Sequence, residues 1–235
     1  MRIDKLLSQM GKATRKESAS LARAGKISVN GVPVKKADVH IDPDKDVVIL
    51  CGEKIVYKEF TYIMLNKPDG YVSATEDGRE RTVLELLPEE ERRKNLFPCG
   101  RLDKNTLGLM ILTNDGDSAH KCLSPKHHFA KTYAFEAKLP ISEEQRVLLE
   151  DGVDIGGYFT MPCKVELDAS RMSGKITLTE GKYHQIKRML ETIDNKITYL
   201  ERISFGGIVL DSTLARGEWR YLTDEEEKEF KGEKR

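Results

Sequence analysis

Residues 100–116 read Gly-Arg-Leu-Asp-Lys-Asn-Thr-Leu-Gly-Leu-Met-Ile-Leu-Thr-Asn-Asp-Gly, an apolar run with charged and polar residues on both sides. The run 107–112 carries no polar side chain, which predicts a buried β-strand. Asn114, Asp115 and Gly116 come directly after it. Because these residue types tolerate a positive φ, we expect them to close the strand with a turn.

A single carboxylate precedes this strand. Asp103 lies in the segment that leads into the run and is flanked by Arg101 and Lys104. Nearby positive charge favours the ionised form of a carboxyl group even where water is excluded, so Asp103 is a candidate nucleophile or base. Taken alone, an Arg-x-Asp arrangement is more often a structural ion pair, and the local residues leave that alternative open.

The composition predicts a soluble globular protein with one large core or two smaller ones. The chain has 235 residues, of which 39% are apolar and 33% are charged, and its 39 basic residues balance 39 acidic ones. The distribution is uneven, because residues 1–36 hold nine Lys and Arg against two acids. A basic module of this kind is typical of a contact with nucleic acid.

Cysteine and histidine spacing indicates neither disulfides nor a metal site. The four cysteines form no Cys-x-x-Cys pair, and Cys122 with His120, His127 and His128 matches no zinc pattern. The N-terminus does not resemble a targeting signal, and no stretch approaches the roughly 20 apolar residues of a membrane span. We therefore expect a cytoplasmic protein that does not contact a membrane and needs no metal.

Residues 1–60 are predicted to form a small α+β module. Apolar residues at 3, 6, 7 and 10 have helical spacing, and Thr14 with Glu17 has the form of a capping box for a second helix that ends near Gly25. Asn30-Gly31 between two short apolar runs predicts a hairpin. A linker is expected over residues 52–60, before a second domain over 61–235.

The second domain is predicted to be a mainly antiparallel β-sheet flanked by helices, so the fold class is α+β. Residues 130–137 alternate as a strand does, and capping boxes at residues 142–145 and 223–226 predict two helices. Ile186, Met189, Leu190 and Ile193 recur at helical spacing. The opposite face of that helix carries His184, Lys187, Arg188 and Glu191.

Several of these stretches together resemble one enzyme family. Residues 100–116 resemble the signature motif of the pseudouridine synthases, specifically the RsuA branch, which modifies ribosomal RNA. Residues 62–72, 131–133, 180–190 and 217–223 resemble its other motifs in the same order, and Ser-Pro-Lys-His-His at 124–128 favours the small-subunit enzymes within the branch. Residues 1–60, with Lys-Ile-Ser-Val-Asn-Gly at 26–31, resemble the S4 RNA-binding domain.

The resemblance implies an isomerase that converts a uridine of ribosomal RNA into pseudouridine without a cofactor. It implies that Asp103 is the catalytic carboxylate and that Tyr133 stacks on the uracil and handles the proton on C5. Lys187 takes the position of the basic residue that pairs with Asp103, although the sequence leaves Arg188 as an alternative partner. The residues expected to line the substrate pocket are Arg101, Thr106 and Ile186.

The resemblance also implies the RNA partner. We expect a monomer that acts on a uridine of the uridine-516 type in 16S rRNA, free or in an assembly intermediate. Two alternatives are a 23S rRNA synthase of a sister branch and a non-catalytic ribosome-binding protein. The residues expected to contact RNA are Arg2, Arg15, Lys16, Arg23, Lys26 and Asn30.

Overall fold

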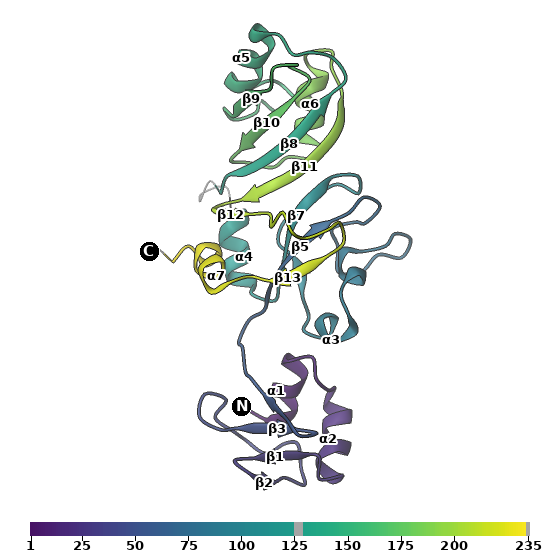
Figure 1. Cartoon of the computed structure of the whole chain (residues 1–235), viewed down its shortest axis with the longest axis vertical. Helices are drawn as coiled ribbons and strands as arrows, with labels where there is room; N and C mark the ends of the chain where they lie inside the picture. Colours follow the sequence, from purple (N-terminus) through teal and green to yellow (C-terminus); the bar gives the residue numbers. More distant parts are fainter. Residues whose placement is uncertain (125–128, 234–235) are drawn as a thin grey trace. The chain divides into compact units, whose positions relative to one another are not determined.

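A computed structural model of the chain describes residues 1–124 and 129–233 (Figure 1). The chain divides into two compact units. The first comprises Met1–Thr61 and Leu84–Phe97, and the second comprises Tyr62–Val83 and Pro98–Arg235. The described part of the chain contains no helix long and apolar enough to cross a membrane.

The first unit consists of a helical pair on a small sheet. Helices α1 (Ile3–Gln9) and α2 (Arg15–Arg23) come first, and the capping box of Thr14 and Glu17 is present at the start of α2. The antiparallel sheet has the order β2-β1-β3-β4. Its strands are β1 (Ile27–Val29), β2 (Val32–Pro33), β3 (Val48–Leu50) and β4 (Glu53–Ile55), and the unit also contains α3 (Glu89–Arg92).

The predicted hairpin between β1 and β2 is confirmed. Asn30 and Gly31 have φ of 51° and 80°, the left-handed conformation that this tight turn requires. The predicted linker, by contrast, starts too early. Residues 53–55 form β4, because Cys51 and Gly52 adopt positive φ values of 51° and 90° and turn the chain back onto β3.

The second unit is organised by one nine-stranded sheet, whose main order is β13-β5-β7-β11-β8-β10-β9. The two short strands β6 (Phe97–Pro98) and β12 (Ile208–Val209) pair with β7 and β11. The strands of the main order are β5 (Tyr62–Lys67), β7 (Leu107–Thr113), β8 (Lys131–Ala137), β9 (Lys164–Leu167), β10 (Ser173–Leu178), β11 (Ile197–Phe205) and β13 (Trp219–Tyr221).

Strands β7 and β11 run parallel, whereas the other pairs of the main order are antiparallel. Gly108 lies opposite Arg202 in this parallel pair and has a φ of 95°. A Cβ at Gly108 would lie 2.3 Å from the Arg202 carbonyl oxygen, so only glycine permits the close approach of the two strands. The predicted strand over 107–112 is confirmed, and residues 109–112 are fully buried.

In the described part of this unit, four α-helices accompany the sheet: α4 (Gly116–Leu123), α5 (Glu143–Asp151), α6 (Gln185–Glu191) and α7 (Asp224–Lys231). The predicted capping boxes of α5 and α7 are present. The expected positive-φ turn after β7 is wrong. Asp115 has a φ of −88° and instead caps α4, because its carboxylate accepts a hydrogen bond from the Ser118 amide.

Candidate active site

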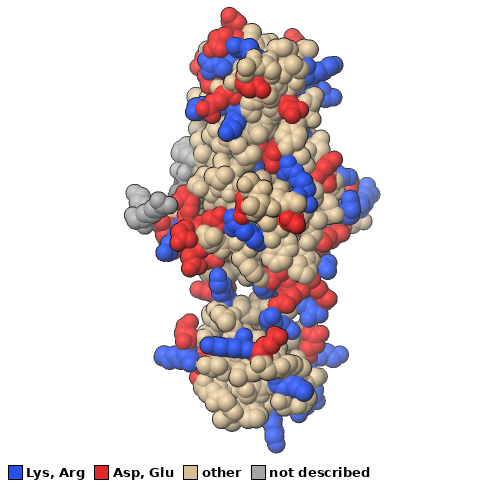
Figure 2. Space-filling view, in the orientation of Figure 1, with Lys and Arg blue, Asp and Glu red and all other residues tan. Residues whose placement is uncertain are grey.

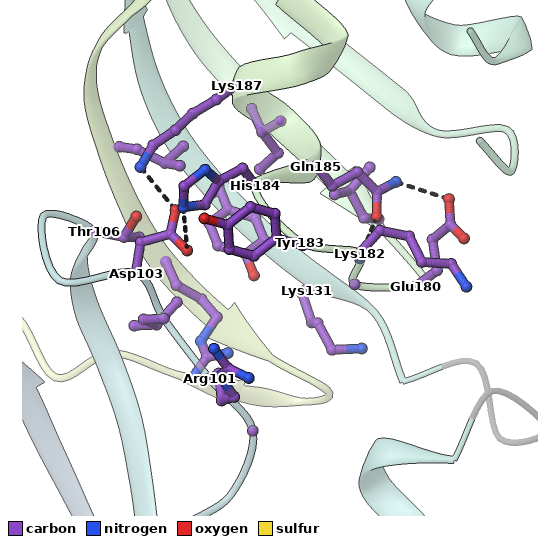
Figure 3. A pocket seen from close by; sticks show the side chains of 18 of the residues that line it. Arg101, Asp103, Thr106, Lys131, Glu180, Lys182, Tyr183, His184, Gln185 and Lys187 are labelled. Atoms are coloured by element: carbon purple, nitrogen blue, oxygen red, sulfur yellow. Dashed lines mark hydrogen bonds and ion pairs between the residues drawn. The ribbon is translucent and has the colours of Figure 1, made fainter. Parts of the chain in front are cut away.

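A pocket of about 720 Å³ opens in the second unit beside the start of β7. Its walls come from the loop before β7, from β8 and β11, and from the segment that begins α6. All six residues predicted for the catalytic and substrate-pocket roles line it: Arg101, Asp103, Thr106, Tyr133, Ile186 and Lys187. Figure 3 shows the Asp103 carboxylate between the side chains of Lys187 and His184.

One buried lysine anchors the loop that carries Asp103 through hydrogen bonds to its backbone. Lys67, at the end of β5, is fully buried and donates hydrogen bonds of 2.9 to 3.0 Å to the carbonyl oxygens of Pro68, Lys104 and Thr106. Its three ammonium protons therefore have three acceptors. Burial lowers the pKa of Lys67 to about 8. Lys67 belongs to the motif at residues 62–72. The sequence signal that it supports the loop is its position at the end of a mainly apolar strand.

The loop is fixed on its other side by Ser73. The Ser73 hydroxyl donates to the Leu102 carbonyl oxygen at 2.8 Å and accepts from the Leu102 amide at 3.0 Å. The Thr106 amide closes a tight turn by donating to the Asp103 carbonyl oxygen at 3.0 Å. The backbone on both sides of Asp103 is thus restrained, which limits the directions that its side chain can take.

The charge partner of Asp103 is Lys187. Its Nζ donates to Asp103 Oδ2 at 2.7 Å and to Asn105 Oδ1 at 2.7 Å. His184 Nε2 lies 3.5 Å from Asp103 Oδ1. The Asp103 side chain is 27% exposed, so the carboxylate is partly shielded from water but open to the pocket.

The prediction that the neighbouring Lys104 places its charge beside the Asp103 carboxylate is wrong. Lys104 Nζ points away and donates to Glu80 at 2.6 Å, whereas Arg101 is exposed at the pocket. Residues adjacent in an irregular segment project in different directions, so closeness in sequence does not bring their charged ends together. The structure also decides between the two alternatives on α6, because Lys187 and not Arg188 contacts Asp103.

Helix α6 presents Lys187 because its other side is anchored in the core. Ile186, Met189, Leu190 and Ile193 are buried, as the spacing predicts. The predicted polar face starts before the helix, since His184 precedes α6 with a left-handed φ of 51°. Its ring stacks on that of Tyr183, with centroids 3.8 Å apart.

Gln185 and Glu180 fix the approach to α6, a role that sequence patterns did not indicate for either residue. The Gln185 side chain accepts from the Lys182 amide at 2.8 Å and donates to Glu180 at 2.7 Å. Glu180 also accepts from the Tyr158 hydroxyl at 2.6 Å and the Met161 amide at 2.9 Å. This network ties the loop before α6 to the pocket rim, as the dashed lines in Figure 3 show in part.

Tyr133, Ile186 and Thr106 provide the inner surface of the pocket. Tyr133 lies on β8 with 9% exposure, and Ile186 has 4%. The Thr106 Oγ1 atom is buried and has no hydrogen-bond partner among the described residues. Within the same part of the chain, the Tyr133 hydroxyl likewise makes no hydrogen bond to protein.

The predicted RNA-contacting residues lie in the first unit. Arg15, Lys16, Arg23 and Lys26 are exposed on α2 and just after it. Lysine and arginine side chains are visible around this unit in the space-filling view (Figure 2). The positive charges of α2 are therefore accessible to a polyanion.

Arg2 and Asn30 also serve the fold of the first unit. Arg2 makes two hydrogen bonds to Asp4, at 2.6 and 3.1 Å. The Asn30 amide donates to Asp46 at 2.8 Å and accepts from the Val47 backbone at 2.9 Å, which joins the hairpin to the segment before β3. Contact of either residue with RNA stays a prediction.

Among the described residues, no group of three or more His, Cys, Asp or Glu side chains is placed to hold a metal ion. His127 and His128 lie outside the described residues, as does most of the Ser-Pro-Lys-His-His segment at 124–128. The described cysteines are free thiols.

Comparison with known proteins assigns this arrangement to a family. Residues 61–192 match the RNA pseudouridylate synthase family and residues 1–48 match the S4 domain. The chain is 49% identical to an uncharacterised RNA pseudouridine synthase of Bacillus subtilis, over 96% of each protein. It is 39% identical to ribosomal small subunit pseudouridine synthase A of Vibrio cholerae, covering 96% of the chain and 97% of that protein.

A solved structure supports the same assignment. The crystal structure of a pseudouridylate synthase, 33% identical, matches with a TM-score of 0.69 and covers 98% of this chain and 99% of that one. Family model, full-length relatives and fold therefore agree. The chain belongs to the RNA pseudouridine synthases, an isomerase family, and carries an S4 domain at its N-terminus.

Proposed function

We propose that the protein converts one specific uridine of small-subunit ribosomal RNA into pseudouridine, with Asp103 as the catalytic residue. The observation that carries the proposal is the 2.7 Å contact of Lys187 with Asp103 at the edge of a pocket lined by Tyr133 and Ile186. The choice of small-subunit RNA is supported by relatives of 36% to 39% identity that are named ribosomal small subunit pseudouridine synthase A.

The reaction is an isomerisation, so its atoms balance without a co-reactant. The bond between N1 of uracil and C1′ of ribose breaks, the base turns, a bond from C5 to C1′ forms, and the proton on C5 is finally lost while N1 gains one. Asp103 supplies the carboxylate, which attacks C1′, attacks the pyrimidine ring or removes a ribose proton. Lys187 stabilises the ionised carboxylate by charge and hydrogen bonding.

The other pocket residues hold the base. Tyr133 stacks on the uracil, a contact worth about 1–3 kcal/mol in nucleic-acid sites, and its hydroxyl handles the C5 proton by passing its own proton on as it accepts the one from C5. Ile186 contacts the base from the α6 side. Since these atoms are shielded inside a duplex, the uridine enters the pocket single-stranded or flipped out, which costs a few kcal/mol.

The S4 unit supplies the binding energy that offsets this cost. Arg15, Lys16 and Arg23 are exposed on one helix, where they neutralise phosphates and position the RNA without reading its sequence. We place the protein in the cytoplasm with its RNA substrate, acting as a monomer and without a cofactor.

The test is a map of pseudouridines in ribosomal RNA from a strain that lacks the protein, with and without a plasmid copy. One pseudouridine of 16S rRNA should disappear and return with the wild-type copy but not with Asp103→Asn. Loss of a 23S rRNA pseudouridine instead would assign the protein to a sister branch. An unchanged map would favour a non-catalytic ribosome-binding protein.

A further inference from the structure

Two cations lie close together in the wall of the pocket. Lys131 begins β8, and Arg202 lies on β11 opposite Tyr133 in the antiparallel register. Lys131 and Tyr133 are alternate residues of β8 and share one face of the sheet. All three line the pocket, so the two cations lie in the wall that carries the tyrosine.

Among the described residues, no carboxylate forms an ion pair with either cation. Arg202 is 1% exposed, and its Nε donates to the Leu109 carbonyl oxygen at 2.8 Å while Nη2 lies 3.9 Å from Met110 Sδ. Lys131 Nζ donates to the Phe129 carbonyl oxygen at 2.9 Å. Throughout the described ranges, 1–124 and 129–233, these partners are neutral, and neither residue forms an ion pair.

The two charges share one aromatic neighbour, Phe205. The Arg202 Cζ lies 5.2 Å and the Lys131 Nζ 5.6 Å from the centroid of that ring. A cation–π contact stabilises each charge by about 0.5–2 kcal/mol but cancels neither. Burial, and after it the charge of Arg202, lowers the pKa of Lys131. Keeping two like charges together in a buried wall is unfavourable unless a ligand supplies the anion.

We infer that Lys131 and Arg202 form a subsite for a phosphodiester of the RNA strand next to the target nucleotide. The inference rests on the proposed function. Because the base lies against Tyr133 on the same face, the phosphates attached to that nucleotide are the anions within reach. Guanidinium and ammonium groups are the usual partners of phosphate oxygens.

The charge balance of the pocket agrees with an anionic ligand. Its lining holds the carboxylates of Asp103 and Glu180, of which the first is bound by Lys187 and the second by Gln185 and Tyr158. Against these stand five cations: Arg101, Lys131, Lys182, Lys187 and Arg202. The subsite holds the strand in place and does not touch the reacting atoms, so its loss should raise KM more than it lowers kcat.

The first test compares Lys131→Met, Lys131→Arg and Arg202→Lys with Lys138→Met, an exposed lysine outside the pocket. The substrate is a transcript of the rRNA segment that the wild-type protein converts. Lys131→Met and Arg202→Lys should raise KM roughly tenfold, as expected for the loss of a hydrogen bond to a charged group. Lys131→Met should also lower the salt slope of binding by about one, whereas Lys131→Arg should recover most of the affinity.

The second test removes the charge from the RNA. A methylphosphonate is placed in turn on either side of the target uridine. At one of the two positions, the KM of wild-type protein should rise about tenfold. The KM of Lys131→Met should rise no further there, because the interaction is already absent.

The outcomes separate the two proposals. If wild-type protein converts the RNA but Lys131→Met and Arg202→Lys behave as Lys138→Met does, the subsite is overturned alone. If the effects of Lys131→Met and of the methylphosphonate on KM multiply at both positions, the subsite is overturned as well. If wild-type protein converts no uridine, the proposed function fails and the subsite fails with it.

Discussion

Lys187 Nζ contacts Asp103 Oδ2 at 2.7 Å although the two residues are 84 positions apart in the chain. The contact joins α6 to the loop before β7. Lys187 Nζ also donates to a second acceptor in this loop, Asn105 Oδ1, at 2.7 Å. The environment of the carboxylate is therefore set by how α6 packs on the sheet and not by the basic residues next to Asp103.

Removing this cation should impair the reaction more than RNA binding. We predict that Lys187→Met lowers turnover by roughly a hundredfold, the effect typical of losing one charge-stabilising group in an active site. The affinity for rRNA should change little. Arg188→Met is the matched control on the same helix, and a larger loss of turnover in Arg188→Met than in Lys187→Met would contradict the assignment.

The hydroxyl of Tyr133 should matter for the last proton transfer only. Tyr133→Phe keeps the ring and should still break and re-form the glycosidic bond, but it should stall before the C5 proton is lost. RNA with 5-fluorouridine at the target has no proton on C5, so both proteins should process it at similar rates. Loss of RNA binding in Tyr133→Phe would show that the residue is structural.

Lys67 should be essential to the stability of the catalytic loop. Lys67→Met leaves three carbonyl oxygens without their donor, so we predict that the free energy of unfolding falls by at least about 2 kcal/mol. Lys104→Met removes an exposed ion pair with Glu80 and should cost less than about 1 kcal/mol. Urea denaturation of both variants measures the difference, and equal losses would contradict the role of Lys67.

The low pKa of Lys67 makes its contribution to stability depend on pH. In the folded protein the pKa is about 8, whereas that of an unfolded lysine is about 10.4. Between these values the unfolded chain binds more protons, so the contribution of Lys67 to stability rises with pH. Wild-type protein should therefore gain stability relative to Lys67→Met between pH 8 and about pH 10. A constant difference across that range would show that the pKa is not lowered.

The positive charges of α2 should govern the salt dependence of binding. Replacing Arg15, Lys16 and Arg23 together by Gln should weaken rRNA binding and lower the slope of log affinity against log salt by about one for each phosphate that is no longer neutralised. Turnover at saturating RNA should be retained. Lys45→Gln, in the same unit and already paired with Asp42, is the control. An unchanged slope in the triple variant would place the RNA-binding charges in the other unit.

Features whose physics is local could be predicted from the sequence. The capping boxes, the Asn30-Gly31 hairpin and the buried strand over 107–112 each depend on residues a few positions apart, and all of them are present. The apolar stripe of α6 was predictable for the same reason. The family motifs identified Asp103, Tyr133 and Lys187, and all three meet in the pocket.

Features that depend on long-range contacts were missed. The carbonyl acceptors that Lys67 finds at Lys104 and Thr106 lie 37 and 39 positions away in the chain. The β3–β4 hairpin, by contrast, is local, and the prediction of a linker over residues 52–60 overlooked its Cys51-Gly52 turn. Asp115 illustrates the limit within one motif, because a residue type that suits a turn also suits a helix N-cap, and the start of α4 decides between them. The uncompensated charge of Arg202 likewise becomes visible only beside its partners on β7 and β11.

The most direct measurement is the rate of pseudouridine formation by Asp103→Asn on the rRNA segment that wild-type protein converts. The substitution keeps the size and shape of the side chain and removes its charge. If Asp103 is the catalytic residue, RNA affinity stays close to that of wild-type protein and the rate falls well below about one percent of the wild-type rate, in line with the loss of a catalytic acid or base. A rate above that level, with the protein folded and RNA bound, would contradict the assignment.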